Sequence, residues 1–382
     1  MGLAFQAKEI EAWMVLPALS LAYLLSGPGP VLRRAGQLAV AGVLVALVSV
    51  SWMTAVSLVP AADRPYVDGS HDNSVFAQVF SYNGFGRFSG QTPAQAEQLD
   101  TGAGLPVPAP AADRLLDGSQ GRDTGWLIPA AAAVALWGIA SRRRQPHRDP
   151  LRACFILWGG WLVTFFVVFT AVTTLRPYYT AALSPAAAAI IGAGVAAARS
   201  RERVPVSRTL GLAVIVAGTA AYAGWLVSSA ARAPGWLVPA IIAVGIAATG
   251  VILWSLVRPR SVPFAGALAA GLVAVTLAPA VASVSLAAHS QGAFDTPFES
   301  ALAQATVAIR TGEQGVIDVR AAIPTWQDIE NGAPYLMAAQ STALPSSIIY
   351  DTGLEALPIG GYDGTAPPPT PGCGGSRPTA PS

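Results

Sequence analysis

Long apolar runs separated by short polar or basic segments dominate this chain. A helix needs about 20 consecutive apolar residues to cross the hydrocarbon core of a bilayer, and these runs have roughly that length. The pattern therefore predicts eight transmembrane helices and an all-α polytopic membrane protein. The helices are expected at residues 10–26, 36–59, 125–141, 151–174, 179–198, 208–230, 235–257 and 262–288.

Arginines gather in the loops that follow the first, third, fifth and seventh runs. These loops lie at residues 33–34, 141–152, 199–208 and 258–260. Because cytoplasmic loops are enriched in Lys and Arg, all four are predicted to be cytoplasmic. The start of the chain, the long loop at 60–124, the turn "LRPYYT" and everything after His289 are then external. We expect a multi-pass protein of the plasma membrane with an external C-terminus.

Composition supports a membrane protein and argues against other classes. Of the 382 residues 53% are hydrophobic and only 12% are charged, whereas soluble domains have about 25% charged residues. Mean hydropathy is +0.49. A net charge of +2 in scattered clusters gives no support for nucleic-acid binding. No HExxH, Walker or GxGxxG motif favours soluble-enzyme chemistry, and Cys154 and Cys373 predict neither a disulfide nor a metal site.

The region after the last apolar run has the composition of a soluble domain. "FESALAQATVAIRT" is typical of an amphipathic helix, "GVIDVRAAI" and "SSIIYDT" are interpreted as short buried strands, and "LPIGGYDG" as a strand ending in a Gly turn. A small α/β domain is predicted. The expected regions are 1–59 (two transmembrane helices), 60–124 (external loop), 125–288 (six transmembrane helices), 289–365 (incomplete external α/β domain) and 366–382 (disordered tail).

The first half of the external loop, residues 64–90, mixes aromatic, Asn and Gly residues, whereas 91–111 has the composition of a flexible linker. Asp68, His71 and Asp72 could bind a divalent metal or transfer protons, because carboxylate and imidazole groups do both. Alternatively, Asp72 or Asn73 caps a short amphipathic helix, "VFAQVFSY", on the membrane surface. A third interpretation is contact with a substrate. Capping is the reading we favour, and metal binding the least.

Two further segments contain candidate ligand residues. Arg176 could bind a phosphate, with Tyr178 and Tyr179 packing on a sugar or a lipid head group. Tyr and Arg at a membrane interface are equally explained as an aromatic belt and a snorkelling cation. Lys8 is the only lysine of the chain and precedes the first run. Its ammonium could pair with a phosphate, or it is an ordinary solvated residue.

Several segments in the same order resemble one family. They are "GLAFQAKEIEAWMVLPALSLAYLL", "RPYVDGSHDNSVFAQVFSYNGFGRFSG", "RLLDGSQGRDTGWLIPAA", "LWGGWLVTFFVVFTAVTTLRPYYTAALSPAAAAIIGAG" and "LPIGGYDGTAPPPT". The chain resembles the bacterial, especially actinobacterial, branch of the dolichyl-phosphate-mannose protein mannosyltransferase superfamily, and is similar to lipid A aminoarabinose transferases. The resemblance covers nearly all of residues 2–365.

This resemblance implies the later half of a GT-C membrane glycosyltransferase that uses a polyprenyl-phosphate sugar donor and an acceptor that could be protein, lipid or glycan. Family members have further spans and an acidic external loop, which holds the catalytic base, ahead of the residue that matches Lys8. They also continue past "GGYDGTAPPPT". We therefore expect a chain truncated at both ends, with its catalytic acid in the missing part.

The implied mechanism is inverting transfer, in which a carboxylate deprotonates the acceptor hydroxyl while the lipid phosphate leaves the sugar. Lys8 and Arg176 are then the candidates for binding the leaving phosphate, and Asp68, His71, Asp72 and Asn73 would help to close the site. The competing interpretation is a catalytically inactive remnant or membrane scaffold. A transporter is less favoured, because the spans contain almost no charged residues.

Overall fold

The computed structural model describes residues 1–64, 67, 70, 72–89, 109–173, 175–199, 206–258, 264–289, 291, 294–304, 323–327, 335–339 and 343–358. By its internal contacts the chain divides into two units. The first unit comprises residues 1–13, 41–106 and 305–382, and the second comprises 14–40 and 107–304. Most of the predicted linker at 91–111, most of "GVIDVRAAI" and the tail at 366–382 lie outside the described residues.

Seven described helices are long and apolar enough to cross a membrane. They are Val31–Ser57, Gly118–Ser141, Pro150–Ala171, Pro177–Ala198, Val206–Ser228, Leu237–Val257 and Ala265–Ala288. They coincide with seven of the eight predicted spans and confirm an all-helical, polytopic membrane region. Charge is absent from most of their length because an ionised group in hydrocarbon is costly.

The remaining predicted span, residues 10–26, is the first along the chain, and in the structure it is shorter and interrupted. It consists of α2 (Ile10–Trp13) and α3 (Leu16–Ser26), and α1 (Gly2–Lys8) precedes it. Pro17 lies in the first turn of α3, where its fixed φ and missing N–H are tolerated. The prediction of one continuous helix was wrong here, because hydropathy alone does not register where a proline restarts a helix.

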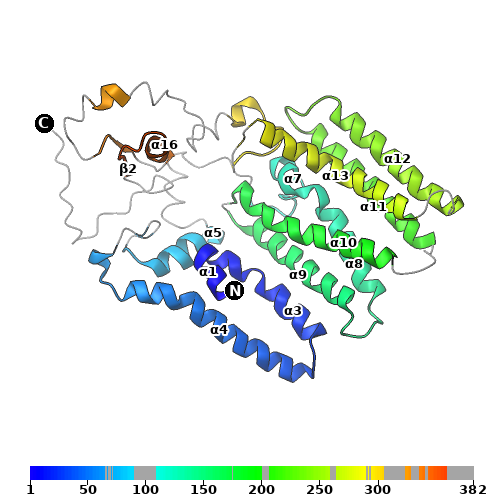
Figure 1. The fold of residues 1–382 in the computed structure, drawn as a ribbon, viewed down its shortest axis with the longest axis horizontal. Helices are drawn as coiled ribbons and strands as arrows, with labels where there is room; N and C mark the ends of the chain where they lie inside the picture. Colours follow the sequence, from blue (N-terminus) through cyan, green and yellow to red (C-terminus); the bar gives the residue numbers. More distant parts are fainter. Residues whose placement is uncertain are drawn as a thin grey trace. The chain divides into compact units, whose positions relative to one another are not determined.

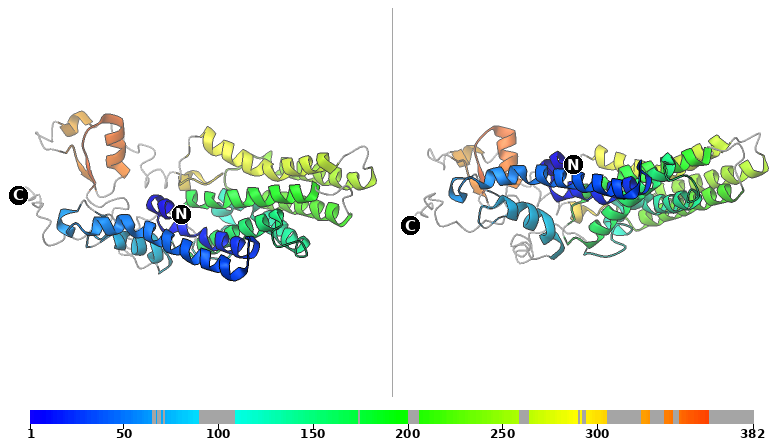
Figure 2. Two further views of the ribbon diagram at one scale, coloured as in Figure 1. Left: turned by 60° about the horizontal axis from the view of Figure 1, so that its bottom comes forward. Right: turned by 90° about the horizontal axis from the view of Figure 1, so that it is seen from below.

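The second unit is a helical bundle (Figures 1 and 2). Its long helices are α8 (Ile128–Ser141), α9 (Pro150–Ala171), α10 (Ser184–Arg199), α11 (Val206–Ser228), α12 (Leu237–Val257) and α13 (Phe264–Ala288). Packing of α3 against α9 adds a further helix. Asp149 begins α9 by accepting a hydrogen bond from the Arg152 N–H at 2.7 Å, and Arg142 of α8 pairs with the same carboxylate at 2.7 Å.

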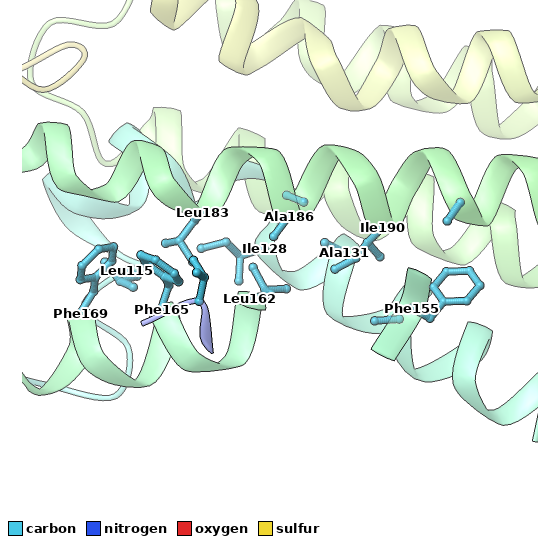
Figure 3. Close-up of a cluster of buried hydrophobic side chains, with 14 of the residues drawn as sticks. Leu115, Ile128, Ala131, Phe155, Leu162, Phe165, Phe169, Leu183, Ala186 and Ile190 are labelled. Carbon is cyan, nitrogen blue, oxygen red and sulfur yellow. The ribbon is translucent and has the colours of Figure 1, made fainter. Parts of the chain in front are cut away.

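Two sets of buried side chains hold this bundle together. Phe155, Leu162, Phe165 and Phe169 of α9 pack against α8 and α10, and Figure 3 shows these side chains meeting between the helices. A second set joins α11, α12 and α13. Helices approach closely at small residues. A Cβ on Gly245 of α12 would stand 2.5 Å from the Ala220 Cβ of α11, the small-residue contact by which helices associate in lipid.

Short elements connect these helices at one end of the bundle. They are α7 (Gly118–Thr124), η3 (Gly125–Leu127) and η4 (Pro177–Leu183). Asp117 begins α7 by accepting a hydrogen bond from the Gly118 N–H. Tyr222 of α11 donates a hydrogen bond to the Leu116 carbonyl at 2.7 Å. The segment that enters α8 is thus fixed to a helix about 100 residues further along the chain.

The helix α4 (Val31–Ser57) belongs to the first unit from residue 41 onward, and η1 (Ala61–Asp63), η2 (Ala77–Phe85) and α5 (Gly86–Ser89) follow it. The helix predicted at "VFAQVFSY" is confirmed, since residues 75–89 are helical, and its place on the membrane surface stays a prediction. Its N-cap is Ser74, whose Oγ accepts a hydrogen bond from the Ala77 N–H at 3.3 Å. The cap is therefore one or two residues later than Asp72 or Asn73, the predicted positions.

The C-terminal region contains β1 (Ala338–Ala339), α16 (Ala343–Thr352) and β2 (Leu357–Pro358), with the strands parallel. The predicted strand at "LPIGGYDG" begins as expected. "SSIIYDT" is helical, so the strand prediction was wrong there. A short apolar run does not distinguish a strand from a helix by itself; the signals were Pro345 in the first turn and Gly353 (φ +72°) just after the end.

Candidate functional site

Arg176 lies where the chain leaves α9 and enters η4. Its backbone is extended (φ −87°, ψ 139°), and Pro177 starts η4 directly after it. The residue is only 8% exposed, and its guanidinium carbon is 5.5 Å from the centre of the Phe294 ring. A snorkelling arginine would extend its head into water. The burial of Arg176 on an aromatic face instead favours a preformed ligand-binding site.

Tyr178 contacts the same phenyl ring as Arg176, and Tyr179 packs on Tyr178. The ring of Tyr178 is 5.6 Å from that of Phe294 at 89°, and 4.5 Å from that of Tyr179. Phe294, which the sequence analysis did not identify, thus brings Arg176 and Tyr178 together, and Tyr179 joins them through Tyr178. Tyr178 is 40% exposed, so an aromatic surface remains open to a ligand next to the buried cation.

Asp123 of α7 joins this group through η4. The Thr180 hydroxyl donates a hydrogen bond to Asp123 Oδ2 at 2.5 Å, and Thr124 Oγ1 donates to the Thr180 carbonyl at 3.3 Å. These bonds fix η4, and with it Arg176 and Tyr178, against α7. We define the Arg176 cluster by this set: Asp123, Arg176, Tyr178, Tyr179, Thr180 and Phe294.

A buried ion pair supports the Phe294 side of the cluster. Arg122 Nη2 lies 2.7 Å from Glu299 Oε1, and Arg122 Nε donates to the Pro297 carbonyl at 3.2 Å. Thr296 donates a hydrogen bond to the same carboxylate oxygen at 3.0 Å. These contacts hold the segment after α13 on α7, so Arg122 positions Phe294 from outside the cluster.

Another buried arginine, Arg114, contacts the end of α9, a few residues before Arg176. Arg114 is 4% exposed and donates hydrogen bonds from Nη1 to the carbonyls of Phe169 and Val172, at the end of α9. Its Nε and Nη2 atoms are buried and have no hydrogen-bond partner among the described residues. Burial lowers the pKa of its guanidinium, because a charge taken out of water is less stable. This end of the bundle therefore concentrates buried positive charge, which suits a phosphate.

Lys8 belongs to the first unit, and the structure therefore does not define its position relative to Arg176. Its Nζ is 3.6 Å from Glu11 Oε2. Glu9 follows it with φ +51°, a strained conformation for a residue with a side chain. Arg87 donates a hydrogen bond to Asn83 Oδ1 at 2.7 Å.

Burial raises the pKa of the Glu9 carboxyl above its ordinary value. A hydrogen bond with Asn83 and the charges of Arg87 and Lys8 oppose that rise. We define the Lys8 cluster as Lys8, Glu9, Glu11, Asn83 and Arg87. The sequence prediction included only its lysine, although the two acids that flank Lys8 were visible in "AKEIE".

Of the four external-loop candidates, the structure describes two, Asp72 and Asn73. Asp68 and His71 lie outside the described residues. Asp72 Oδ1 accepts a hydrogen bond from the Ser74 N–H at 3.2 Å. Asn73 adopts φ +58° and holds the loop together, since its Oδ1 accepts from the Val67 N–H at 2.6 Å and its Nδ2 donates to the Ala61 carbonyl at 2.9 Å.

A metal site is not supported by the part of the chain that the structure covers. Within it, no three His, Cys, Asp or Glu side chains lie close enough to hold an ion. The predicted metal ligands Asp68 and His71 fall outside that part. The contacts of Asp72 and Asn73 are those of a folded loop.

Comparisons with known proteins point to one class. The Bacillus subtilis (strain 168) protein named "Putative mannosyltransferase YycA" is 24% identical over 449 aligned residues, which cover 96% of this chain and 64% of that protein. "Putative mannosyltransferase YkcB" of the same organism is 39% identical over 90 residues, 24% of this chain and 13% of that protein. This chain thus spans less than two thirds of the length of either relative. No family model matches the chain, and no solved structure matches it.

Proposed function

We propose that this chain acts in a membrane glycosyltransferase that moves a hexose, mannose first among the candidates, from a polyprenyl-phosphate donor to an acceptor at the external face of the plasma membrane. The observation that carries the proposal is the Arg176 cluster, where a buried arginine lies on an aromatic ring at an end of a membrane bundle. The similarity to two proteins named as mannosyltransferases supports the same class.

The chemistry of the donor fits the residue types of the cluster. A polyprenyl-phosphate sugar has an apolar tail, an anionic phosphate and a sugar ring. Arginine binds phosphate through its planar N–H edge while its face stacks on an aromatic ring, as Arg176 stacks on Phe294. Tyr178 and Tyr179 offer ring faces and hydroxyls to the sugar. Arg114 adds a second positive charge at the same end of α9.

The reaction is a displacement at the anomeric carbon. The acceptor hydroxyl oxygen forms the new bond to that carbon, the bond to the lipid phosphate oxygen breaks, and its electron pair stays on the phosphate. The hydroxyl proton passes to a carboxylate. Arg176 stabilises the charge that develops on the phosphate. Asp123 is a positioning residue, because its carboxylate holds η4 through Thr180.

Placement of the cluster on the external face follows from the positive-inside rule. The arginine-rich segments 141–152 and 199–208 follow α8 and α10, and η4 lies at the other ends of the helices that they connect. The GT-C fold and the actinobacterial type belong to this proposal through the resemblance of the ordered motifs.

The direct test is transfer of labelled mannose from polyprenyl-phosphate mannose, measured in membranes that contain the full chain and in membranes from the same host without it. Product that depends on the chain supports the enzyme. Absence of product, while the protein is folded in the membrane and still binds the donor, would instead favour the inactive remnant or scaffold.

To test the sugar specificity, the same assay is repeated with two other donors. Polyprenyl-phosphate glucose and polyprenyl-phosphate aminoarabinose are supplied at the same concentration as the mannose donor. A preference for either one would retain the transferase and replace mannose as the sugar.

A further inference from the structure

A cavity of about 420 Å³ lies inside the second unit, away from the Arg176 cluster. It is lined by α8, α10, α11 and α13, and its lining is almost entirely apolar. The exceptions among the lining side chains are Ser207 and Arg208, both in the first turn of α11. Its volume is within the range of about 300 to 1,000 Å³ that is typical of ligand pockets.

The cavity is located at the membrane end opposite to η4. Lining residues come from α8 between Ala130 and Trp137, from the later half of α10 up to Ala198, and from the earlier halves of α11 and α13. Along α11 the lining runs from Ser207 to Val216, which at 1.5 Å per residue is about 14 Å. That is about half of the 30 Å hydrocarbon core. The cavity therefore matches the depth of a single leaflet.

Small residues keep this space open between the two cores of the bundle. One core joins α8, α9 and α10, and another joins α11, α12 and α13. Gly194 of α10 packs so closely on α8 that a Cβ there would stand 2.5 Å from Val134 Cγ1. Gly211 of α11 is different, since its Cβ would meet nothing within 4 Å. Close packing within each core thus leaves a gap between them.

Positive charge marks the mouth of the cavity. The Arg208 guanidinium carbon is 5.7 Å from the Trp137 ring centre, and none of the described residues that line the cavity is acidic. The N-terminus of α11, with its exposed N–H groups, lies at the same place. The stretch of sequence that ends at Arg208, "RSRERVPVSR", has four arginines, Arg208 among them, and one glutamate. The surroundings therefore favour an anion at the mouth and a hydrocarbon chain inside.

We propose that this cavity binds an acyl chain of an anionic phospholipid, with the lipid phosphate on Arg208. A nucleotide or a sugar does not fit, because its polar groups would have no partners on an apolar lining. The bound chain fills the gap between the two cores and so joins the halves of the bundle. This site is independent of the proposed transferase activity and lies at the other end of the helices.

The test compares two lipids on the purified, delipidated full chain in detergent. Dioleoyl phosphatidylglycerol and dioleoyl phosphatidylcholine have the same chains and differ in head-group charge. We expect phosphatidylglycerol to bind about fivefold more tightly, the increment of one basic side chain at an anionic surface. Binding is counted by native mass spectrometry and followed by the rise in melting temperature.

Three variants separate the parts of the site. Arg208→Gln should remove the preference for phosphatidylglycerol. Gly211→Leu should fill the cavity and abolish binding of both lipids. Gly218→Leu is the matched control, because Gly218 is on the same helix, has nothing within 4 Å of its Cβ and does not line the cavity. Its lipid binding should equal that of the unmodified chain.

Several results would overturn the proposal. They are equal affinity for the two lipids in the unmodified chain, unchanged preference in Arg208→Gln, and unchanged binding in a folded Gly211→Leu variant. Competition by polyprenyl phosphate at a lower concentration than phosphatidylglycerol would also reject it and assign the cavity to the donor lipid. If Gly211→Leu does not fold, the preference measured with Arg208→Gln still decides.

Discussion

The Lys8 cluster and the Arg176 cluster contain similar residue types in different arrangements. In the Lys8 cluster two acids lie next to two cations, and the contact of Lys8 with Glu11 is one between opposite charges. In the Arg176 cluster the arginine lies on an aromatic ring, and the acid accepts from a neutral hydroxyl. Stacking of an arginine on an aromatic ring is an arrangement typical of phosphate recognition. The difference indicates where to look for the donor phosphate.

The largest expected effect comes from breaking the support of Phe294. Arg122→Ala removes a buried guanidinium and leaves the partly exposed Glu299 carboxylate without its cation, and we expect a loss of about 3 kcal/mol in the free energy of unfolding. Because Phe294 is released, transfer per folded molecule should also fall. Thermal unfolding in detergent and the mannose transfer assay measure the two effects.

Arg142→Ala is the control for that experiment. It removes an ion pair of the same 2.7 Å length between α8 and Asp149, far along the chain from Phe294. Stability should fall while transfer per folded molecule stays the same. Equal losses of transfer in the two variants would mean that Arg122 has no particular role in the cluster.

A smaller effect is expected when η4 is freed from α7. Thr180→Val keeps the shape of the side chain but removes the hydroxyl that donates to Asp123, which should cost about 1.5 to 3 kcal/mol of stability. Arg176 and Tyr178 then lose their fixed position, so KM for the donor should rise. Thr219→Val is the matched control, because this buried hydroxyl donates to the Ile215 carbonyl of its own helix.

In the first unit, substitutions in the loop at residues 72–73 should lower stability without lowering transfer. Asn73→Ala removes the side-chain bonds to Val67 and Ala61 and should cost about 1 to 3 kcal/mol. Asp72→Ala, which loses one exposed contact at 3.2 Å, should cost less. Neither should change transfer per folded molecule. A fall in transfer at unchanged stability would favour substrate contact by this loop.

The smallest expected effect is a pH dependence from Glu9. Burial raises its folded-state pKa above the ordinary value of 4.5, so the folded protein is favoured when this carboxyl is protonated. That contribution is complete at acidic pH and is lost as pH rises through the raised pKa. Glu9→Gln should remove this part of the pH dependence, which begins as pH rises above about 4.5. The same dependence of melting temperature on pH in the two proteins would contradict it.

The sequence predicted the structure well where a single local property, such as the length of an apolar run, determines it. The transmembrane helices follow from the length of apolar runs, and Arg176, Tyr178 and Tyr179 follow from their place between two of them. Phe294 and Asp123 were missed because they reach the cluster only through tertiary packing; Asp123 and Thr180 are 57 residues apart. The interruption near Pro17 was missed because hydropathy does not show where a proline restarts a helix. The helix at 343–352 was missed because a short apolar run does not distinguish a strand from a helix.

The central claim is that the Arg176 cluster recognises the donor phosphate. Its most direct test is donor binding and transfer by Arg176→Ala compared with Arg232→Ala, since Arg232 is an exposed arginine of the same unit that contacts Gln304 at 3.3 Å. We predict that Arg176→Ala lowers transfer by about 100-fold or more while the folded fraction is retained. Transfer by Arg232→Ala should stay within about twofold of the unmodified chain, because a surface contact contributes only about 0–1 kcal/mol. Equal transfer by both variants would contradict the account.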